Sequence, residues 1–252
     1  MTDARASRGA VLVTGGSKRI GRAICLALAA AGYDVAIHHR DSLTEADEVA
    51  TAVRDMGRGA VVLAADLIDE TATRALVPAA AAALGPLTAL VNNASVFEDD
   101  RVGSLDRATW DRHLDTNLRA PIVLAEAFAA QAPDGSAIVN LLDQRVLKPD
   151  PRFFSYSLSR NALWWATRTM AQALAPAIRV NGVGPGPTLP SVHQTEAEFA
   201  AEAAGTLLQT PGSPEAVAEA VRWLLAADMV TGQMIAVDGG QHLAWRTPDI
   251  LE

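Results

Sequence analysis

The sequence contains a single cysteine, Cys25, among 252 residues, which excludes an internal disulfide. Cys25 lies in an apolar helical pattern, where a small core residue is expected rather than a reactive thiol. No stretch has the roughly 18 or more uncharged apolar residues of a membrane span. The first residues, MTDARASRG, lack the apolar run of a signal peptide. We therefore expect a soluble cytoplasmic protein.

Basic charge is also scarce, with a formal net charge of -8 and a pI of about 5.1. Contacts with nucleic-acid phosphates need a basic surface, so nucleic acid is disfavoured as a partner. No basic run suggests binding to a membrane surface, and we expect no metal site. Lysine is the scarcest cation: only Lys18 and Lys148 occur among 21 basic residues. Arginine occupies almost every other basic position.

Half of the residues are hydrophobic, and short apolar strands alternate with helical patterns along the whole chain. Such alternation predicts βαβ units and a parallel sheet, whose strands are apolar throughout because both faces are buried. We expect strands at 10–16, 34–40, 59–67, 87–95, 136–143, 177–186 and 233–240, and helices at 20–32, 43–56, 70–84, 106–131, after 153, and 214–226.

This pattern predicts one α/β domain over residues 1–252. It would be a Rossmann-type, doubly wound parallel sheet of about seven strands with helices on both faces. The segment 187–212 is rich in Pro, Thr, Glu and Ala and has the least regular pattern. We interpret it as an excursion from the carboxyl edge of the sheet and as a substrate lid.

The stretch VTGGSKRIG joins the first expected strand to the first expected helix. Glycines at this place permit a tight turn and the close approach of a pyrophosphate to a helix N-terminus. An ordinary strand-to-helix turn is the alternative. The expected cofactor contacts in this loop are Gly15, Ser17, Lys18, Arg19, Ile20 and Gly21.

The second expected strand ends in His38, His39 and Arg40. Dinucleotide folds that prefer NAD usually carry an acid here, which binds the ribose 2′-hydroxyl. Cations suit a 2′-phosphate instead, and Lys18 lies in the neighbouring glycine loop. We therefore expect NADP(H) as the cofactor. A solvated strand end is the alternative for these residues, and Asp41 leaves NAD open.

Further motifs follow in a set order along the chain, and together they resemble the short-chain dehydrogenase/reductase family over nearly its whole length. Asp66-Leu67 ends the third strand, NNAS follows the fourth, Asn117 lies in NLRAP, Tyr156 begins YSLSR, and Pro185-Gly186 follows the sixth strand. The resemblance implies catalytic roles for Asn117 and Tyr156. It also implies cofactor contacts from Asp66, Leu67, Asn93, Ala94, Tyr156, Arg160, Pro185 and Gly186.

Within that family, four places are similar to the pteridine reductase branch. Arg19 stands where the usual glycine loop has its middle glycine, and NNAS, with Phe97 two residues on, replaces NNAG. Asp143 stands 13 residues before Tyr156, where most members of the family have a catalytic serine. The His and Arg at the end of the second strand are the fourth place.

The resemblance implies that Arg19 reaches over the cofactor phosphate toward the substrate and that Phe97 stacks on a pterin. Ser95, Asp143 and Tyr156 would bind the substrate as well. Each place has a structural alternative: Arg19 binds phosphate only, Phe97 is a core aromatic under the lid, and Asp143 caps the loop backbone. The resemblance further implies a homotetramer, in which the helices at about 106–131 and 153–174 pack between subunits.

Tyr156 and Arg160 lie four residues apart and so share one helical face. We interpret Tyr156 as the proton donor of a hydride-transfer reaction. Lowering a phenol pKa from about 10 to about 7 requires roughly 4 kcal/mol of phenolate stabilisation. A cation at about 4 Å in an effective dielectric near 20 supplies about that much. We therefore expect Arg160 to lower the pKa of Tyr156, and an ionised Asp143 to oppose it.

The family has lysine where this chain has Arg160, so two classes of function stay open. The first is an NADPH-dependent reductase of a pteridine, of the dihydropterin or dihydrofolate type, or of another small carbonyl compound. The second is a non-catalytic NADP-binding protein in which arginine has disabled the site. Arg19, Phe97 and Asp143 favour the first.

Overall fold

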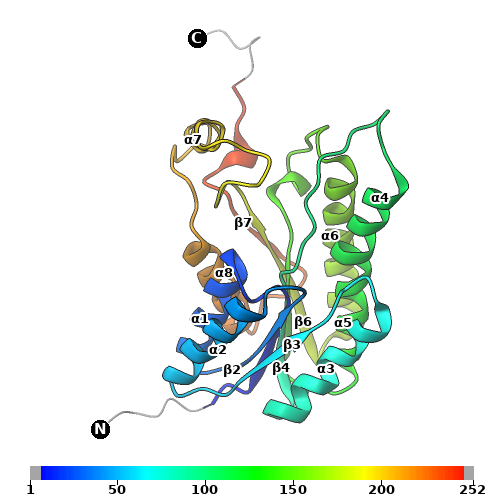
Figure 1. Ribbon diagram of the computed structural model, residues 1–252, viewed down its shortest axis with the longest axis vertical. Helices are drawn as coiled ribbons and strands as arrows, with labels where there is room; N and C mark the ends of the chain where they lie inside the picture. The colour runs from blue at the N-terminus through cyan, green and yellow to red at the C-terminus, as the bar shows by residue number, and fades with distance from the viewer. Residues whose placement is uncertain (1–6, 247–252) are drawn as a thin grey trace.

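The computed structural model describes residues 7–246, and in this range seven parallel strands form one sheet in the order β3-β2-β1-β4-β5-β6-β7 (Figure 1). The chain adds strands outward on one side of β1 and then crosses to build the other side from β4. The carboxyl ends of β1 and β4 therefore flank the switch point, where folds of this kind bind ligands. The strands are β1 (Ala10–Val13), β2 (Asp34–His39), β3 (Ala60–Ala64), β4 (Leu87–Asn92), β5 (Ser136–Leu141), β6 (Ile178–Pro185) and β7 (Met234–Val237).

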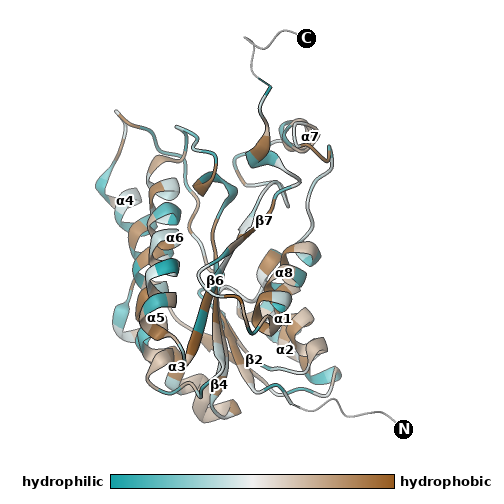
Figure 2. Ribbon diagram, turned by 180° about the vertical axis from the view of Figure 1, so that it is seen from behind, coloured by the Kyte–Doolittle hydropathy of each residue, from teal (hydrophilic) through white to brown (hydrophobic). Residues whose placement is uncertain are grey.

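Helices cover both faces of this sheet and create two apolar cores (Figures 1 and 2). One core lies between the sheet and α1 (Arg19–Ala31), α2 (Leu43–Asp55) and α8 (Pro214–Ala226). The other lies under α3 (Glu70–Leu84), α5 (Ala120–Ala129) and α6 (Phe154–Leu174). The remaining elements are α4 (Arg107–Leu114), a π-helical turn η1 (Asp115–Arg119), α7 (Glu196–Ala204), and the 3-10 turns η2 (Gln144–Val146) and η3 (Gln241–Leu243).

The predicted fold class is confirmed, and every expected strand lies where the sequence placed it. The expectation that all strands are buried on both faces was wrong for β3 and β7, which are only partly buried because they form the two edges of the sheet. The prediction of Cys25 as a core residue is confirmed: it is fully buried, and burial raises the pKa of its thiol.

Two helical regions differ from the sequence expectation. The region 106–131 is interrupted by η1 between α4 and α5. The segment 187–212 contains α7, which begins with a reciprocal capping box between Thr195 and Glu198. Over residues 7–246, none of the helices combines the length and the apolar character that crossing a membrane requires.

Candidate active site

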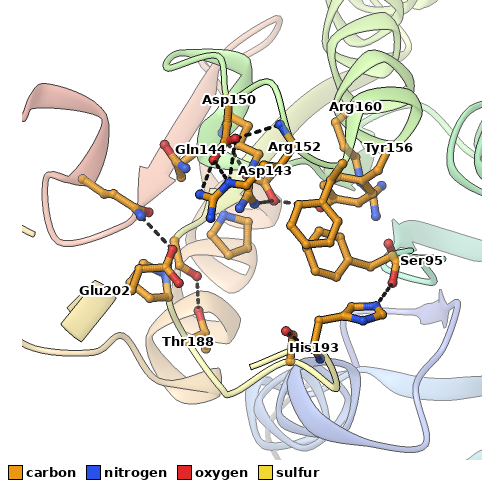
Figure 3. A pocket seen from close by; sticks show the side chains of 18 of the residues that line it. Ser95, Asp143, Gln144, Asp150, Arg152, Tyr156, Arg160, Thr188, His193 and Glu202 are labelled. Carbon is orange, nitrogen blue, oxygen red and sulfur yellow. Dashed lines mark hydrogen bonds and ion pairs between the residues drawn. The ribbon is translucent and has the colours of Figure 1, made fainter. Parts of the chain in front are cut away.

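A cavity of about 1270 Å³ opens at the carboxyl edge of the sheet (Figure 3). Its walls come from the glycine loop, the segment after β4, the β5–α6 connection, the first turns of α6, and residues 185–202. Elements distant in the sequence meet here because parallel strands end at the same edge. Of the residues expected from the sequence, Arg19, Ile20, Asn93, Ser95, Phe97, Asp143, Tyr156, Arg160, Pro185 and Gly186 line the cavity.

The other expected residues lie outside the lining of this cavity. Most of them belong to the glycine loop or to the ends of β2 and β3, on the same edge of the sheet. Leu67 is buried, and Asp66 is exposed and accepts a hydrogen bond from the backbone N–H of Ile68. The full set is Gly15, Ser17, Lys18, Gly21, His38, His39, Arg40, Asp66, Leu67, Ala94 and Asn117.

The glycine loop is packed as a close backbone turn. Gly15 has a φ of +60°, and a Cβ atom there would lie 3.0 Å from the Cα of Ala94. A Cβ on Gly21 would lie only 2.0 Å from the carbonyl oxygen of Gly15. Any side chain at residue 21 would therefore displace the first turn of α1 from the loop.

His38 supports this loop from below and does not present a cation to it. The N–H of Gly15 donates to His38 Nδ1 at 3.1 Å, so His38 Nε2 carries the ring proton and donates to the carbonyl oxygen of Ala65 at 3.1 Å. Burial lowers the pKa of His38 to about 4. The expectation of His38 as a positive ligand for phosphate was wrong, because a buried imidazole with both nitrogens in use is neutral at pH 7.

The exposed cations near the end of β2 are paired with acids. Lys18 Nζ lies 2.7 Å from Glu45, and Arg40 Nε lies 2.6 Å from Asp41. His39 is buried, and its Nδ1 accepts from the backbone N–H of Ser42. These pairs are solvent-exposed, so their acids hold them weakly and an incoming anion can compete.

Arg19 occupies a left-handed backbone conformation, with a φ of 52°, that normally suits glycine. Its guanidinium Nη2 donates to the carbonyl oxygens of Leu189 and Pro190, at 3.4 and 3.0 Å. The side chain thus runs from the glycine loop to the beginning of the segment expected to be a lid. This placement puts a cation on the cavity wall at the cost of backbone strain.

The centre of the site is a hydrogen bond from Tyr156 Oη to Asp143 Oδ2 at 2.8 Å (Figure 3). Asp143 lies in the connection that follows β5, and Tyr156 lies in the first turn of α6. Asp143 also accepts from the backbone N–H of Arg145 at 2.8 Å and from Arg145 Nη1 at 3.3 Å. Asp143 therefore caps the loop backbone, as the structural alternative predicted, and it also contacts Tyr156.

Arg160 does not lower the pKa of Tyr156 below its ordinary value, as the sequence led us to expect. Burial raises the pKa of Tyr156, and the Asp143 carboxylate raises it further, while Arg160 opposes both effects. The Arg160 guanidinium carbon lies 5.3 Å from the centre of the Tyr156 ring, and Nη1 donates to the carbonyl oxygen of Leu141 at 2.9 Å. The Arg160 cation thus lies beside the Tyr156 ring. Its lowering effect on the pKa of Tyr156 is smaller than the combined raising effects of burial and Asp143.

Phe97 is part of an aromatic group rather than a lone ring. Its ring stacks on Phe153 at 4.2 Å with 17° between the planes, and contacts Tyr156 edge-on at 4.7 Å. His193 lies 6.0 Å from Phe97, and its Nε2 bonds the carbonyl oxygen of Phe97 at 3.2 Å. Phe97 therefore lies at the cavity wall beside Tyr156.

Asn117 lies outside the lining of the cavity, and its catalytic role stays a prediction. Its side-chain amide accepts from the backbone N–H of Val96 at 2.8 Å and donates to the carbonyl oxygen of Val96 and to Ser159 Oγ. These bonds use its donors and fix the segment after β4 against α6. Asn117 lies in the π-helical turn η1 and is buried there.

Sequence reasoning missed Arg145, Phe153 and His193. Arg145 had a signal, because an arginine two residues after Asp143 can return to its carboxylate within one turn. Phe153 precedes α6 with a φ of 53°, and His193 lies in a segment without regular structure. Their approach to Phe97 depends on long-range folding and has no local pattern.

Comparison with known proteins identifies relatives along nearly the whole chain. Residues 15–242 match the family model described as enoyl-(acyl carrier protein) reductase. A curated 3-oxoacyl-[acyl-carrier-protein] reductase, FabG of Aggregatibacter actinomycetemcomitans, is 33% identical over 239 residues, covering 91% of this chain and 98% of the relative.

Two solved structures share the fold at high similarity. The alternative dihydrofolate reductase 1, FolM, of Brucella canis, crystallised with NADP, has a TM-score of 0.94 and 48% identity over 98% of this chain and 99% of its own. A short-chain dehydrogenase from Burkholderia cenocepacia J2315, also in complex with NADP, has a TM-score of 0.89 and 34% identity over 94% and 99% of the two chains.

The buried His38 predicts a pH-dependent stability. A histidine in the unfolded chain titrates near 6.5 and His38 in the fold near 4, so protonation favours unfolding. Its contribution is complete above about pH 6.5 and is lost as the pH falls toward 4, by up to about 3 kcal/mol. His38→Gln keeps a donor and an acceptor without titrating. As the pH falls from about 6.5 toward 4, urea denaturation should show the variant becoming more stable relative to wild type. If the free energy of unfolding of the two proteins depends on pH in the same way, the assignment is contradicted.

Proposed function

The chain belongs to the short-chain dehydrogenase/reductase family, and from this premise we propose that it is an NADP(H)-dependent reductase of a pteridine, of the dihydropterin or dihydrofolate type. The observation that carries the proposal is the bond between Tyr156 and Asp143 beside the Phe97 ring. A tyrosine proton donor, a carboxylate in place of a serine, and an aromatic platform suit a flat heterocycle. The similarity to FolM of Brucella canis supports the same substrate class.

The residues present fit a dinucleotide. Gly15 and Gly21 permit the tight turn that brings the loop onto the start of α1, because a Cβ at either would meet neighbouring backbone atoms. The N-terminus of α1 then offers free N–H groups and a positive dipole end to a pyrophosphate. Gly186 shows the same constraint, since its Cβ would lie 2.6 Å from the Cβ of Asp238. We propose that the loop holds the pyrophosphate, with Ser17 and Ile20 contributing to it.

We propose the remaining cofactor contacts from the places of the residues in the fold. Lys18 and Arg40 would hold the 2′-phosphate, with His39 behind them. Arg160 would hold the nicotinamide ribose: its Nε is buried and has no partner among residues 7–246. Asp66, Leu67, Asn93, Ala94, Pro185 and Gly186 would line the adenine and nicotinamide ends.

The bound nicotinamide supplies the hydride, and the side chains of this chain supply the proton and the orientation. The raised pKa of Tyr156 keeps its hydroxyl protonated at neutral pH, so a proton is always available to the substrate nitrogen or oxygen. Asp143 Oδ2 fixes the position of the hydroxyl, and Arg160 offsets the negative charge that forms on the phenolate. Phe97 would hold the substrate ring, with Ser95 and Arg19 at its edge.

A second candidate is the reduction of another small carbonyl compound, favoured by the similarity to the 3-oxoacyl-[acyl-carrier-protein] reductase. A third is cofactor binding without turnover, favoured by Arg160, whose Nη1 is bound to the Leu141 carbonyl. We further propose that residues 1–252 form one domain with a lid at 187–212, and that the protein is a cytoplasmic homotetramer.

Cofactor choice should favour NADP(H) over NAD(H) by at least about tenfold, or about 1.4 kcal/mol. Since His38 is neutral, the preference rests on Lys18 and Arg40. Arg40→Ala should weaken NADPH while leaving NADH affinity unchanged by calorimetry. Arg54→Ala is the control, because Arg54 binds Ala60 at the opposite end of β3. Equal affinities in the wild type would instead indicate Asp41 as a ribose ligand.

The proposed reaction is tested by NADPH oxidation with dihydrobiopterin, dihydrofolate, simple ketones and a 3-oxoacyl thioester. We expect the pteridines to be reduced fastest. Tyr156→Phe should abolish turnover, because it removes the transferable proton, yet bind NADPH within about twofold of wild type. Tyr33→Phe, at the one other tyrosine of the sequence, should stay active. Preference for the ketones or the thioester would move the function to the second candidate.

Arg160→Lys separates a working substitution from a damaged site. If arginine supplies the charge that the phenolate needs, lysine should change kcat by less than about tenfold, or about 1.4 kcal/mol of barrier. Arg160→Ala should lower kcat and weaken NADPH together. An inactive wild type that Arg160→Lys activates would establish the non-catalytic alternative.

A further inference from the structure

Asp143 receives three hydrogen bonds, and two of them come from Arg145. The backbone N–H of Arg145 donates to Oδ1 at 2.8 Å, and its Nη1 donates to Oδ2 at 3.3 Å. The third donor is Tyr156 Oη, which shares Oδ2. One residue therefore fixes the orientation of the carboxylate through its backbone and offsets the charge through its side chain.

The guanidinium of Arg145 is itself held in place by two rings. Its central carbon lies 5.7 Å from the centre of Phe97 and 5.5 Å from the centre of Phe153. The side chains of Arg145 and Asp143 are only 14% and 12% exposed, so water screens the pair little. Among the ion pairs of residues 7–246, Arg145 is the one cation joined to Asp143.

This placement matters for the proton that Tyr156 gives up. When the O–H bond breaks and the proton bonds to the substrate, a phenolate forms 2.8 Å from the oxygen of an ionised carboxylate. Two like charges at that distance in a buried site repel strongly. Arg160 lies beside the phenol ring, and Arg145 Nη1 donates to Oδ2, the carboxylate oxygen that also accepts from Tyr156. The two cations together balance the two negative charges.

We propose that Arg145 is a positioning residue for the reduction: it orients Asp143 against Tyr156 and offsets the carboxylate charge, so that Tyr156 can release its proton. The inference rests on the proposed function. The electrons come with the hydride of the nicotinamide, and the phenolate recovers its proton from water after the product leaves. Arg145 acts through Asp143 and takes no proton itself, because a guanidinium does not titrate in this range.

The test is a double-mutant cycle between Arg145 and Asp143, measured with NADPH and the best substrate of the panel. Arg145→Gln should lower kcat by at least about tenfold while KM and NADPH affinity stay within about threefold. In an Asp143→Asn background the same change should alter kcat by less than about twofold, because the charge to be offset is gone. Independent, additive effects of the two substitutions would overturn the proposal.

Two further variants separate charge from packing. Arg145→Met keeps the apolar contacts with Phe97 and Phe153 and should be as slow as Arg145→Gln, whereas Arg145→Lys should recover at least about a third of the lost kcat. Full activity of Arg145→Met would assign the residue to packing and overturn the proposal. Arg222→Gln is the matched control, because it removes an arginine paired with Glu219 on α8, outside the cavity.

The outcome also distinguishes this inference from the proposed function. A wild type that reduces pteridine while Arg145→Gln matches it in kcat leaves the function standing and overturns the role of Arg145. A wild type that reduces none of the compounds overturns the function and the inference together. Thermal denaturation of every variant verifies that a loss of kcat does not come from unfolding.

Discussion

The bond between Tyr156 and Asp143 is the interaction on which the rest of the site depends. It joins the connection after β5 to the first turn of α6, and it can form only because β5 ends at the same edge as β4 and β6. The phenol is kept protonated by burial and by the carboxylate. The same two causes raise the free energy of the phenolate. Two cations offset this cost: Arg145 contacts the carboxylate and Arg160 lies beside the phenol ring.

Much of the fold could be predicted from the sequence because the local strand and helix patterns agree with the overall topology. Apolar strands alternate with amphipathic helices, and residues 70–84 coincide with α3 at both ends. The spacing of 13 residues between Asp143 and Tyr156 also became a real contact. The sequence analysis identified Arg19 as standing in place of a glycine, and the structure shows that Arg19 adopts the left-handed backbone conformation that glycine favours.

What the sequence did not provide are the properties that arise from burial and from long-range contact. His38 looks like a cation at a strand end, yet the glycine loop covers it and makes it neutral. Arg160 carries the expected charge, yet its strength depends on where the guanidinium lies and on how deeply Tyr156 is buried. Phe153 and His193 meet Phe97 from separate segments, and no periodicity encodes such a meeting.

The two bonds from Arg19 to the carbonyls of Leu189 and Pro190 carry a thermodynamic consequence. One side chain contacts both the loop proposed to hold a pyrophosphate and the segment proposed as a lid. If that segment is a lid, a ligand that draws this guanidinium away from those carbonyls would shift the equilibrium between covered and uncovered cavity. By reciprocity, uncovering the cavity changes the affinity for that ligand by the same factor. In the proposed enzyme, a single strained arginine would thus link ligand binding at the glycine loop to access to the cavity.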